Sequence, residues 1–192
     1  MPSADGRKGH GSTHLGDGKM EELKTYERFP MPIVLLCNLL SISLYAIGIY
    51  ILAQCGIWWA VLYLMYCSWI ELKLLRHSCV NCYYYGNVCG FGKGKLCALL
   101  FQKGDPQKFA EKECKWLDLL PDFLVSIFPL IGGIVLLIMD FNWIILILLI
   151  ALLVLTSAGN AFIRGSYACK YCKQKELGCP AEQLFNKKPL EA

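Results

Sequence analysis

Long apolar stretches alternate with polar segments along this chain, and they come in two pairs. The four apolar segments cover residues 33–53, 56–75, 119–139 and 142–163. Each contains roughly 20 residues, which at about 1.5 Å rise per residue matches a hydrocarbon core about 30 Å thick. The last segment is apolar on every side, as is typical of a helix in lipid or in a bundle interior. We therefore predict an all-α integral membrane protein with four transmembrane helices.

The connections between these segments predict how the helices pair. Only Gln54 and Cys55 separate the first two segments, and only Asp140 and Phe141 separate the last two. Connections this short join antiparallel neighbours. The chain is thus predicted to form transmembrane hairpins over residues 30–76 and 119–163. A Cys-rich loop over 77–118 joins them, and a Cys-rich tail follows over 164–192.

Charge predicts how the hairpins are oriented. Lysines and arginines lie in the N-terminal tail, between Lys73 and Lys115, or after Ile163, and neither hairpin turn carries one. Loops rich in Lys and Arg remain on the cytoplasmic side of a membrane. Residues 1–29 are polar, lack the apolar core of a signal peptide, and are expected to be a disordered tail. We predict that both termini and the Cys-rich segments face the cytoplasm.

The composition agrees with a membrane protein. The chain is 56% hydrophobic and 18% charged, whereas soluble domains average about 45–50% apolar and 25% charged residues. The expected partners are the lipid bilayer and either a cytoplasmic or membrane protein or another copy of the chain. Nothing in the sequence predicts binding to nucleic acid.

A cysteine motif occurs once after each hairpin. Both copies have the spacing C-x2-C-x6-C, and each cysteine of the second copy lies 90 residues after its counterpart in the first. The first copy is Cys79, Cys82 and Cys89, and the second is Cys169, Cys172 and Cys179. Because both halves begin and end on the same side, we interpret them as parallel repeats related by an axis along the membrane normal.

The cysteine usage points to a metal. Of the eleven cysteines, Cys37, Cys55 and Cys67 lie in spans or a turn, where cysteine behaves as a small apolar residue. The other eight are predicted to be cytoplasmic, where thiols stay reduced. A C-x2-C pair directs two thiolates to one ion, as in zinc and iron–sulfur sites. Zinc is the expected cofactor. An iron–sulfur cluster and metal-free redox thiols are the alternatives.

The eight thiolates can be divided in two ways. One division forms a site shared between the halves from Cys79, Cys82, Cys169 and Cys172. Cys89, Cys97, Cys114 and Cys179 then remain for a second site. The other division keeps each motif whole. The first motif then takes its fourth ligand from His77 or Cys97, and the second borrows one, for which Cys114 is available. The sequence leaves both divisions open.

The sequence favours a binding role over catalysis. We find no Ser-His-Asp set, no H-E-x-x-H and no dinucleotide fingerprint. The run from Gly90 to Lys95 does not meet the phosphate-loop pattern, because Leu96 follows Lys95. We expect that run to form turns around a metal site, with contact to lipid headgroups or an anionic ligand as the alternative. The leading hypothesis is a membrane-anchored, zinc-binding module with a structural or partner-docking role. The alternatives are an iron–sulfur or dithiol redox protein and a small membrane enzyme or metal-handling protein.

Overall fold

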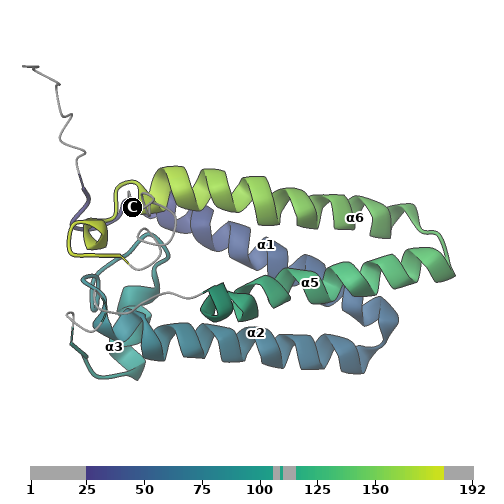
Figure 1. Ribbon diagram of the computed structural model, residues 1–192, viewed down its shortest axis with the longest axis horizontal. Helices are drawn as coiled ribbons and strands as arrows, with labels where there is room; N and C mark the ends of the chain where they lie inside the picture. The colour runs from purple at the N-terminus through teal and green to yellow at the C-terminus, as the bar shows by residue number, and fades with distance from the viewer. Residues whose placement is uncertain (1–24, 106–108, 110–115, 180–192) are drawn as a thin grey trace, which may run out of the picture.

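The structure, a computed structural model, describes residues 25–105, 109 and 116–179. Throughout these ranges the protein is built from helices and contains no β-strand; Tyr26 and Cys172 form only an isolated parallel bridge. The long helices lie side by side as an elongated bundle (Figure 1). The helical elements are α1 (Met31–Cys55), α2 (Ile57–His77), η1 (Cys79–Asn81), α3 (Lys93–Leu100), α5 (Trp116–Met139), α6 (Trp143–Val154), η2 (Leu155–Cys169) and η3 (Lys173–Lys175).

Three helices are long and apolar enough to cross a membrane. They are Met31–Cys55, Leu120–Met139 and Trp143–Cys169. This confirms the prediction of an all-helical chain with membrane-spanning character. The second predicted span corresponds to α2, which has 21 residues but is not among the three. The mean hydropathy of α2 is lowered by its three tryptophans and by two tyrosines and one serine near its middle. The charged pair Glu71 and Lys73 lowers it further.

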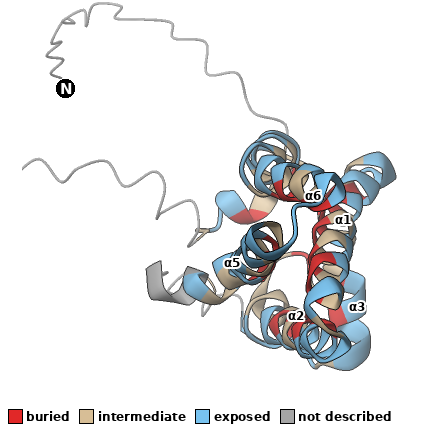
Figure 2. Ribbon diagram, turned by 90° about the vertical axis from the view of Figure 1, so that its right-hand side faces the viewer, coloured by how far each residue is buried: buried red, intermediate tan, exposed pale blue. Residues whose placement is uncertain are grey.

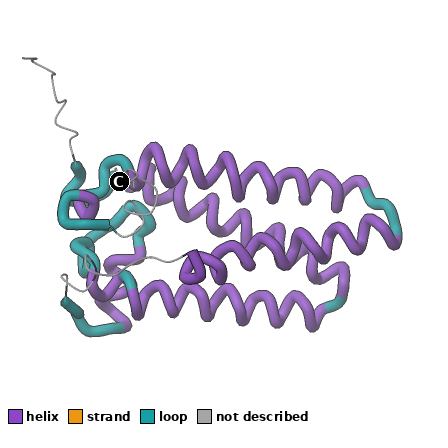
Figure 3. Tube along the Cα trace, viewed as in Figure 1, coloured by secondary structure: helices purple, strands orange, loops and turns teal. Residues whose placement is uncertain are grey.

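Tight turns join α1 to α2 and α5 to α6. Gly56 alone separates α1 from α2, and its φ of 146° is a conformation that favours glycine. Asn142 caps the start of α6, where its side chain accepts a hydrogen bond from the Ile144 N–H at 2.8 Å. These turns lie at one end of the bundle, and the longer loops of the described chain lie at the other (Figure 3).

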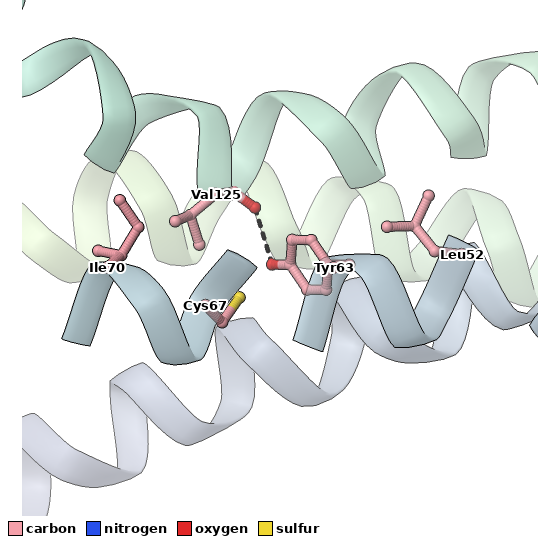
Figure 4. Packing of buried hydrophobic residues seen from close by; sticks show 5 residues of the cluster. All are labelled: Leu52, Tyr63, Cys67, Ile70 and Val125. Atoms are coloured by element: carbon pink, nitrogen blue, oxygen red, sulfur yellow. Dashed lines mark hydrogen bonds between the residues drawn. The ribbon is translucent and has the colours of Figure 1, made fainter. Parts of the chain in front are cut away.

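Small residues let the helices approach closely. A Cβ on Gly48 of α1 would lie 2.5 Å from the Tyr63 hydroxyl oxygen of α2. Tyr63 fills this notch and donates a hydrogen bond to the Val125 carbonyl at 2.8 Å, within a core that also includes Cys67 and Ile70 (Figure 4). A Cβ on Gly133 would likewise meet the Leu149 side chain at 2.6 Å. Close packing of small residues is a common source of stability between membrane helices.

The outer surface of the bundle is strongly apolar. Buried residues face inward, toward neighbouring helices (Figure 2). Large side chains point outward, including Leu39 at 62%, Trp58 at 77% and Ile138 at 80% exposure. An apolar surface this extensive is unfavourable in water. The helices are therefore suited to contact with the lipid bilayer.

The last long helix changes character part-way along. After Val154 it continues as η2, a π-helix that runs to Cys169, beyond the end of the predicted span. π-Helices are rare and usually single-turn features, often at functional sites. Two side chains in η2, Asn160 and Arg164, each bury a polar atom that has no hydrogen-bond partner in the structure.

Candidate metal centre

The two cysteine motifs lie at the same end of the bundle. The first follows α2 and begins with η1, and the second follows η2 and runs into η3. Both lie among the loops at the end of the molecule opposite the two hairpin turns (Figures 1 and 3). The antiparallel order of the helices thus places two segments 90 residues apart in the chain on one end of the molecule.

The backbone folds in the same way at both C-x2-C pairs. The Cys82 N–H donates to the Cys79 carbonyl at 3.3 Å, and the Cys172 N–H donates to the Cys169 carbonyl at 3.2 Å. The second cysteine of each pair is extended, with φ and ψ of −82° and 150° at Cys82 and −80° and 120° at Cys172. The shared spacing therefore has a shared local geometry in the part of the chain that is described.

Each second cysteine also accepts a backbone hydrogen bond at sulfur. The donor is the N–H two residues later, at Tyr84 for Cys82 and at Gln174 for Cys172, and it lowers the thiol pKa. Burial has the larger, opposite effect and raises the pKa of Cys82 to about 11 and that of Cys172 to about 12. Without a metal both thiols are thus protonated at neutral pH. N–H donors aimed at sulfur favour the thiolate that a metal requires.

The thiol of Cys79 lies near other cysteines of the first Cys-rich segment. Burial, followed by the nearby thiols of Cys89, Cys97 and Cys82, raises the pKa of Cys79 to about 12. Cys97 lies on α3, and α3 packs against η1, where Cys79 lies. These four thiols are available to the division that keeps the first motif whole and takes Cys97 as its fourth ligand.

The second motif lies next to the first. The charges that raise the pKa of Cys172, after burial, are those of Cys82, Cys169 and Cys179. Cys172 also packs with Cys82 and Cys89 around the same small core, built on Phe29, Val34 and Tyr84. The two motifs are therefore neighbours in space.

A short segment before α1 lies between the two motifs and joins them. The Tyr26 N–H donates to the Tyr171 carbonyl at 3.0 Å. The Tyr84 hydroxyl donates to the Tyr26 carbonyl and accepts from the Lys173 N–H, the latter at 3.0 Å. Tyr84 is only 1% exposed. One buried hydroxyl thus connects the N-terminal segment, the first motif and the second.

Two further contacts close this interface. The buried Gln174 side chain accepts from the Tyr83 N–H at 2.8 Å and donates to the Gly178 carbonyl at 3.1 Å. A Cβ on Gly90 would lie 3.0 Å from the Cβ of Ala168, so a larger residue at this position would push the two segments apart.

The remaining candidate ligands differ in their surroundings. Cys97 is fully buried and its thiol donates to the Leu75 carbonyl at 3.5 Å. His77 is exposed at the C-terminal end of α2. Cys114 lies outside the described residues. None of the ten described cysteines forms a disulfide. Within the described ranges, no three His, Cys, Asp or Glu side chains are grouped closely enough to hold a metal ion, so binding would require the thiols to converge.

Sequence reasoning missed the polar contacts that hold this end together. The segment predicted as a Cys-rich loop over 77–118 contains a helix, α3, and its first residue, Lys93, pairs with Glu71 of α2. The three tyrosines at 83–85 were a sequence signal for an ordered segment, since a run of aromatics beside two cysteines is unusual in a flexible loop. Gln174 gave none.

Comparisons with protein-family models, with curated proteins and with solved structures found no match to this chain.

Proposed function

We propose that this protein is a membrane-anchored zinc-binding module in which thiolates bind metal at the cytoplasmic face and fasten the ends of the helices together. One observation carries the proposal: two C-x2-C turns with matching backbone geometry lie side by side at one end of the bundle. Zinc prefers four ligands in a tetrahedron, and thiolate is among its common ligands.

The first ion takes its ligands from the first motif and α3. Cys79, Cys82, Cys89 and Cys97 supply four sulfurs, and the charge on each of the last three raises the pKa of Cys79. The second motif, with Cys169, Cys172 and Cys179, supplies three ligands to a second ion and takes a fourth from elsewhere, for which Cys114 is available. The metal acts by fixing structure, since buried thiols with a raised pKa are poor nucleophiles.

The orientation is part of the same proposal. The halves are parallel repeats, α2 is the fourth span, and both motifs face the cytoplasm. Support comes from the distribution of lysine and arginine, which avoid both hairpin turns. Further support comes from the contact between α1 and α2 along their length. Reduced cytoplasmic thiols are what a thiolate metal site requires.

Thiol labelling in intact cells tests this orientation. A maleimide that cannot cross membranes should modify Cys55, which is exposed at the first hairpin turn, and should leave Cys169, which is also exposed, unmodified. The control is the same cells after permeabilisation with a zinc chelator, in which both cysteines should react. Modification of Cys169 in sealed cells would show that the motifs face the oxidising side, and the reduced metal site would then be ruled out.

Elemental analysis tests the metal. The full chain, purified in detergent without oxygen, should be colourless and carry close to two zinc ions. Because zinc binding displaces protons from thiols, the bound zinc should fall as the pH is lowered below neutral. Brown protein with broad visible absorption and stoichiometric iron would show that the thiolates bind an iron–sulfur cluster and not zinc. Protein that carries no metal but has titratable thiols would contradict both the zinc and the iron–sulfur hypotheses and would favour a dithiol redox protein.

A further inference from the structure

A second polar site lies near the metal-binding end, between the helices. It is an open cavity of about 360 Å³, formed by residues of α1, α2, α3 and the loop before α3. Asn38, Ser41, Tyr45, Glu71 and Lys93 contribute its polar side chains. None of these residues belongs to the proposed metal centre.

The anionic group in the cavity is already neutralised. Glu71 forms an ion pair with Lys93 and accepts a hydrogen bond from the Tyr45 hydroxyl at 2.6 Å. One carboxylate and one ammonium therefore cancel. The charge of the site is then decided by whatever third charged group lies beside it.

That third group is Arg164, which lies behind the cavity wall. One terminal nitrogen, Nη2, donates to the Ser41 hydroxyl at 2.8 Å, and the guanidinium lies 5.3 Å from the centre of the Phe91 ring. Ser41 and Phe91 both line the cavity. The Nε of Arg164 is buried and has no hydrogen-bond partner, and no ion pair among the described residues includes Arg164. A half-buried guanidinium with one buried, unsatisfied N–H donor favours an anion nearby.

Exposed apolar side chains border the cavity, which lies inside the apolar layer of the bilayer. Ser41 is ten residues into α1, so it lies about 15 Å along the axis from the helix start. A 25-residue helix such as α1 is about 37 Å long and exceeds a hydrocarbon core of about 30 Å by only about 7 Å, so a lipid headgroup must be drawn below the interface to reach Ser41. The rim carries Ile42 and Leu96, at 62% and 48% exposure. A ligand with a charged head and apolar tails could thus enter from the bilayer.

We propose that this cavity binds a phosphate-class oxyanion, which contacts Lys93 in the cavity lining and is attracted by the charge of Arg164 beside Ser41 and Phe91. The group is either the phosphate of an anionic lipid or free phosphate. The site carries one net positive charge and keeps an unused N–H donor, and arginine is well suited to phosphate oxygens. The proposal does not depend on the metal centre and holds whether or not zinc binds.

Binding can be measured on the full chain in a neutral detergent. Titrations with phosphatidylglycerol, phosphatidylcholine and inorganic phosphate would be followed by native mass spectrometry and by the shift in thermal unfolding. The wild type should bind phosphatidylglycerol at least about tenfold more tightly than phosphatidylcholine, as expected for one charge-assisted contact. A response to phosphatidylglycerol alone identifies a lipid site, and a matching response to inorganic phosphate identifies a free-anion site.

Matched variants separate the site from general attraction between charges. Arg164→Gln should weaken binding at least about tenfold, whereas Lys95→Gln removes the same charge from an exposed position on α3 and should leave binding unchanged. If Arg164→Gln unfolds, Leu96→Trp blocks the rim with Arg164 intact. Its control, Leu99→Trp, is on the same helix, 83% exposed and outside the cavity. Equal binding of both lipids, or equal effects within either variant pair, would overturn the proposal.

Discussion

Replacing Cys97 by serine is expected to remove one zinc ion from each chain and to expose the segment around the first motif to proteases. In the proposed site Cys97 is the only ligand contributed by α3, so its loss leaves three thiolates and detaches the helix from the motif. Loss of even an indirect metal contact typically costs 10- to 100-fold in affinity, so loss of a ligand should cost at least about a hundredfold. A serine hydroxyl can still donate to the Leu75 carbonyl, as the thiol does, so the substitution separates ligation from hydrogen bonding.

For this variant, zinc content would be measured by elemental analysis and protease sensitivity by limited proteolysis. Cys55→Ser serves as the matched control, since Cys55 is exposed at the opposite end of the bundle and donates to the Gly132 carbonyl at 3.7 Å. The control should keep both ions. Full zinc content in Cys97→Ser together with loss of one ion in His77→Gln would assign the fourth ligand to His77 and contradict the set proposed here.

Much of the architecture could be predicted from the sequence because the signal is long and one-dimensional. Apolar runs of about 20 residues reflect bilayer thickness directly, and a connection of two residues allows only antiparallel packing. Glycines within apolar runs, such as Gly48 and Gly133, are visible in the sequence, and nothing larger than hydrogen fits at either position because neighbouring side chains lie within 3 Å of an added Cβ. These features depend on local sequence and need no knowledge of distant contacts.

The rest depends on which residues meet across long sequence distances. Glu71 pairs with Lys93, 22 residues later, and Arg164 reaches Ser41, 123 residues earlier. Neither pairing has a sequence period that could reveal it. The status of α2 was also hard to predict, since its aromatic side chains suit a membrane interface or a bundle yet score poorly on hydropathy.

The cysteine motifs fall between these cases. Their spacing predicted the local turn at Cys79–Cys82 and Cys169–Cys172, because i to i+3 spacing closes a turn wherever the backbone permits. Spacing alone left the grouping of thiols open. The packing of α3 on η1 brings Cys97 to the first motif, and this contact depends on a helix that the sequence reading treated as loop.

Replacing Tyr84 by phenylalanine should release the second cysteine motif from the first while leaving the helix bundle folded. The ring stays in its buried position, but the lost hydroxyl leaves the Tyr26 carbonyl and the Lys173 N–H without their partner. An unsatisfied buried polar group costs about 1–3 kcal/mol. These two unpaired groups lie on different segments, so both can bond to water if the segments separate. The rate of amide hydrogen exchange in residues 169–179 should therefore rise at least about tenfold.

Tyr85→Phe is the matched control, because its hydroxyl donates at 2.7 Å to the Phe101 carbonyl within the first Cys-rich segment and does not reach the second motif. It should raise exchange near residues 85–101 and leave 169–179 protected. Hydrogen exchange followed by mass spectrometry resolves the two regions in one experiment. Unchanged protection of 169–179 in Tyr84→Phe would mean that Gln174 and the contact between Gly90 and Ala168 hold the motifs together without the tyrosine. If added zinc restores protection to that segment in Tyr84→Phe, the metal and the hydroxyl stabilise the same interface, and the two motifs form one structural unit.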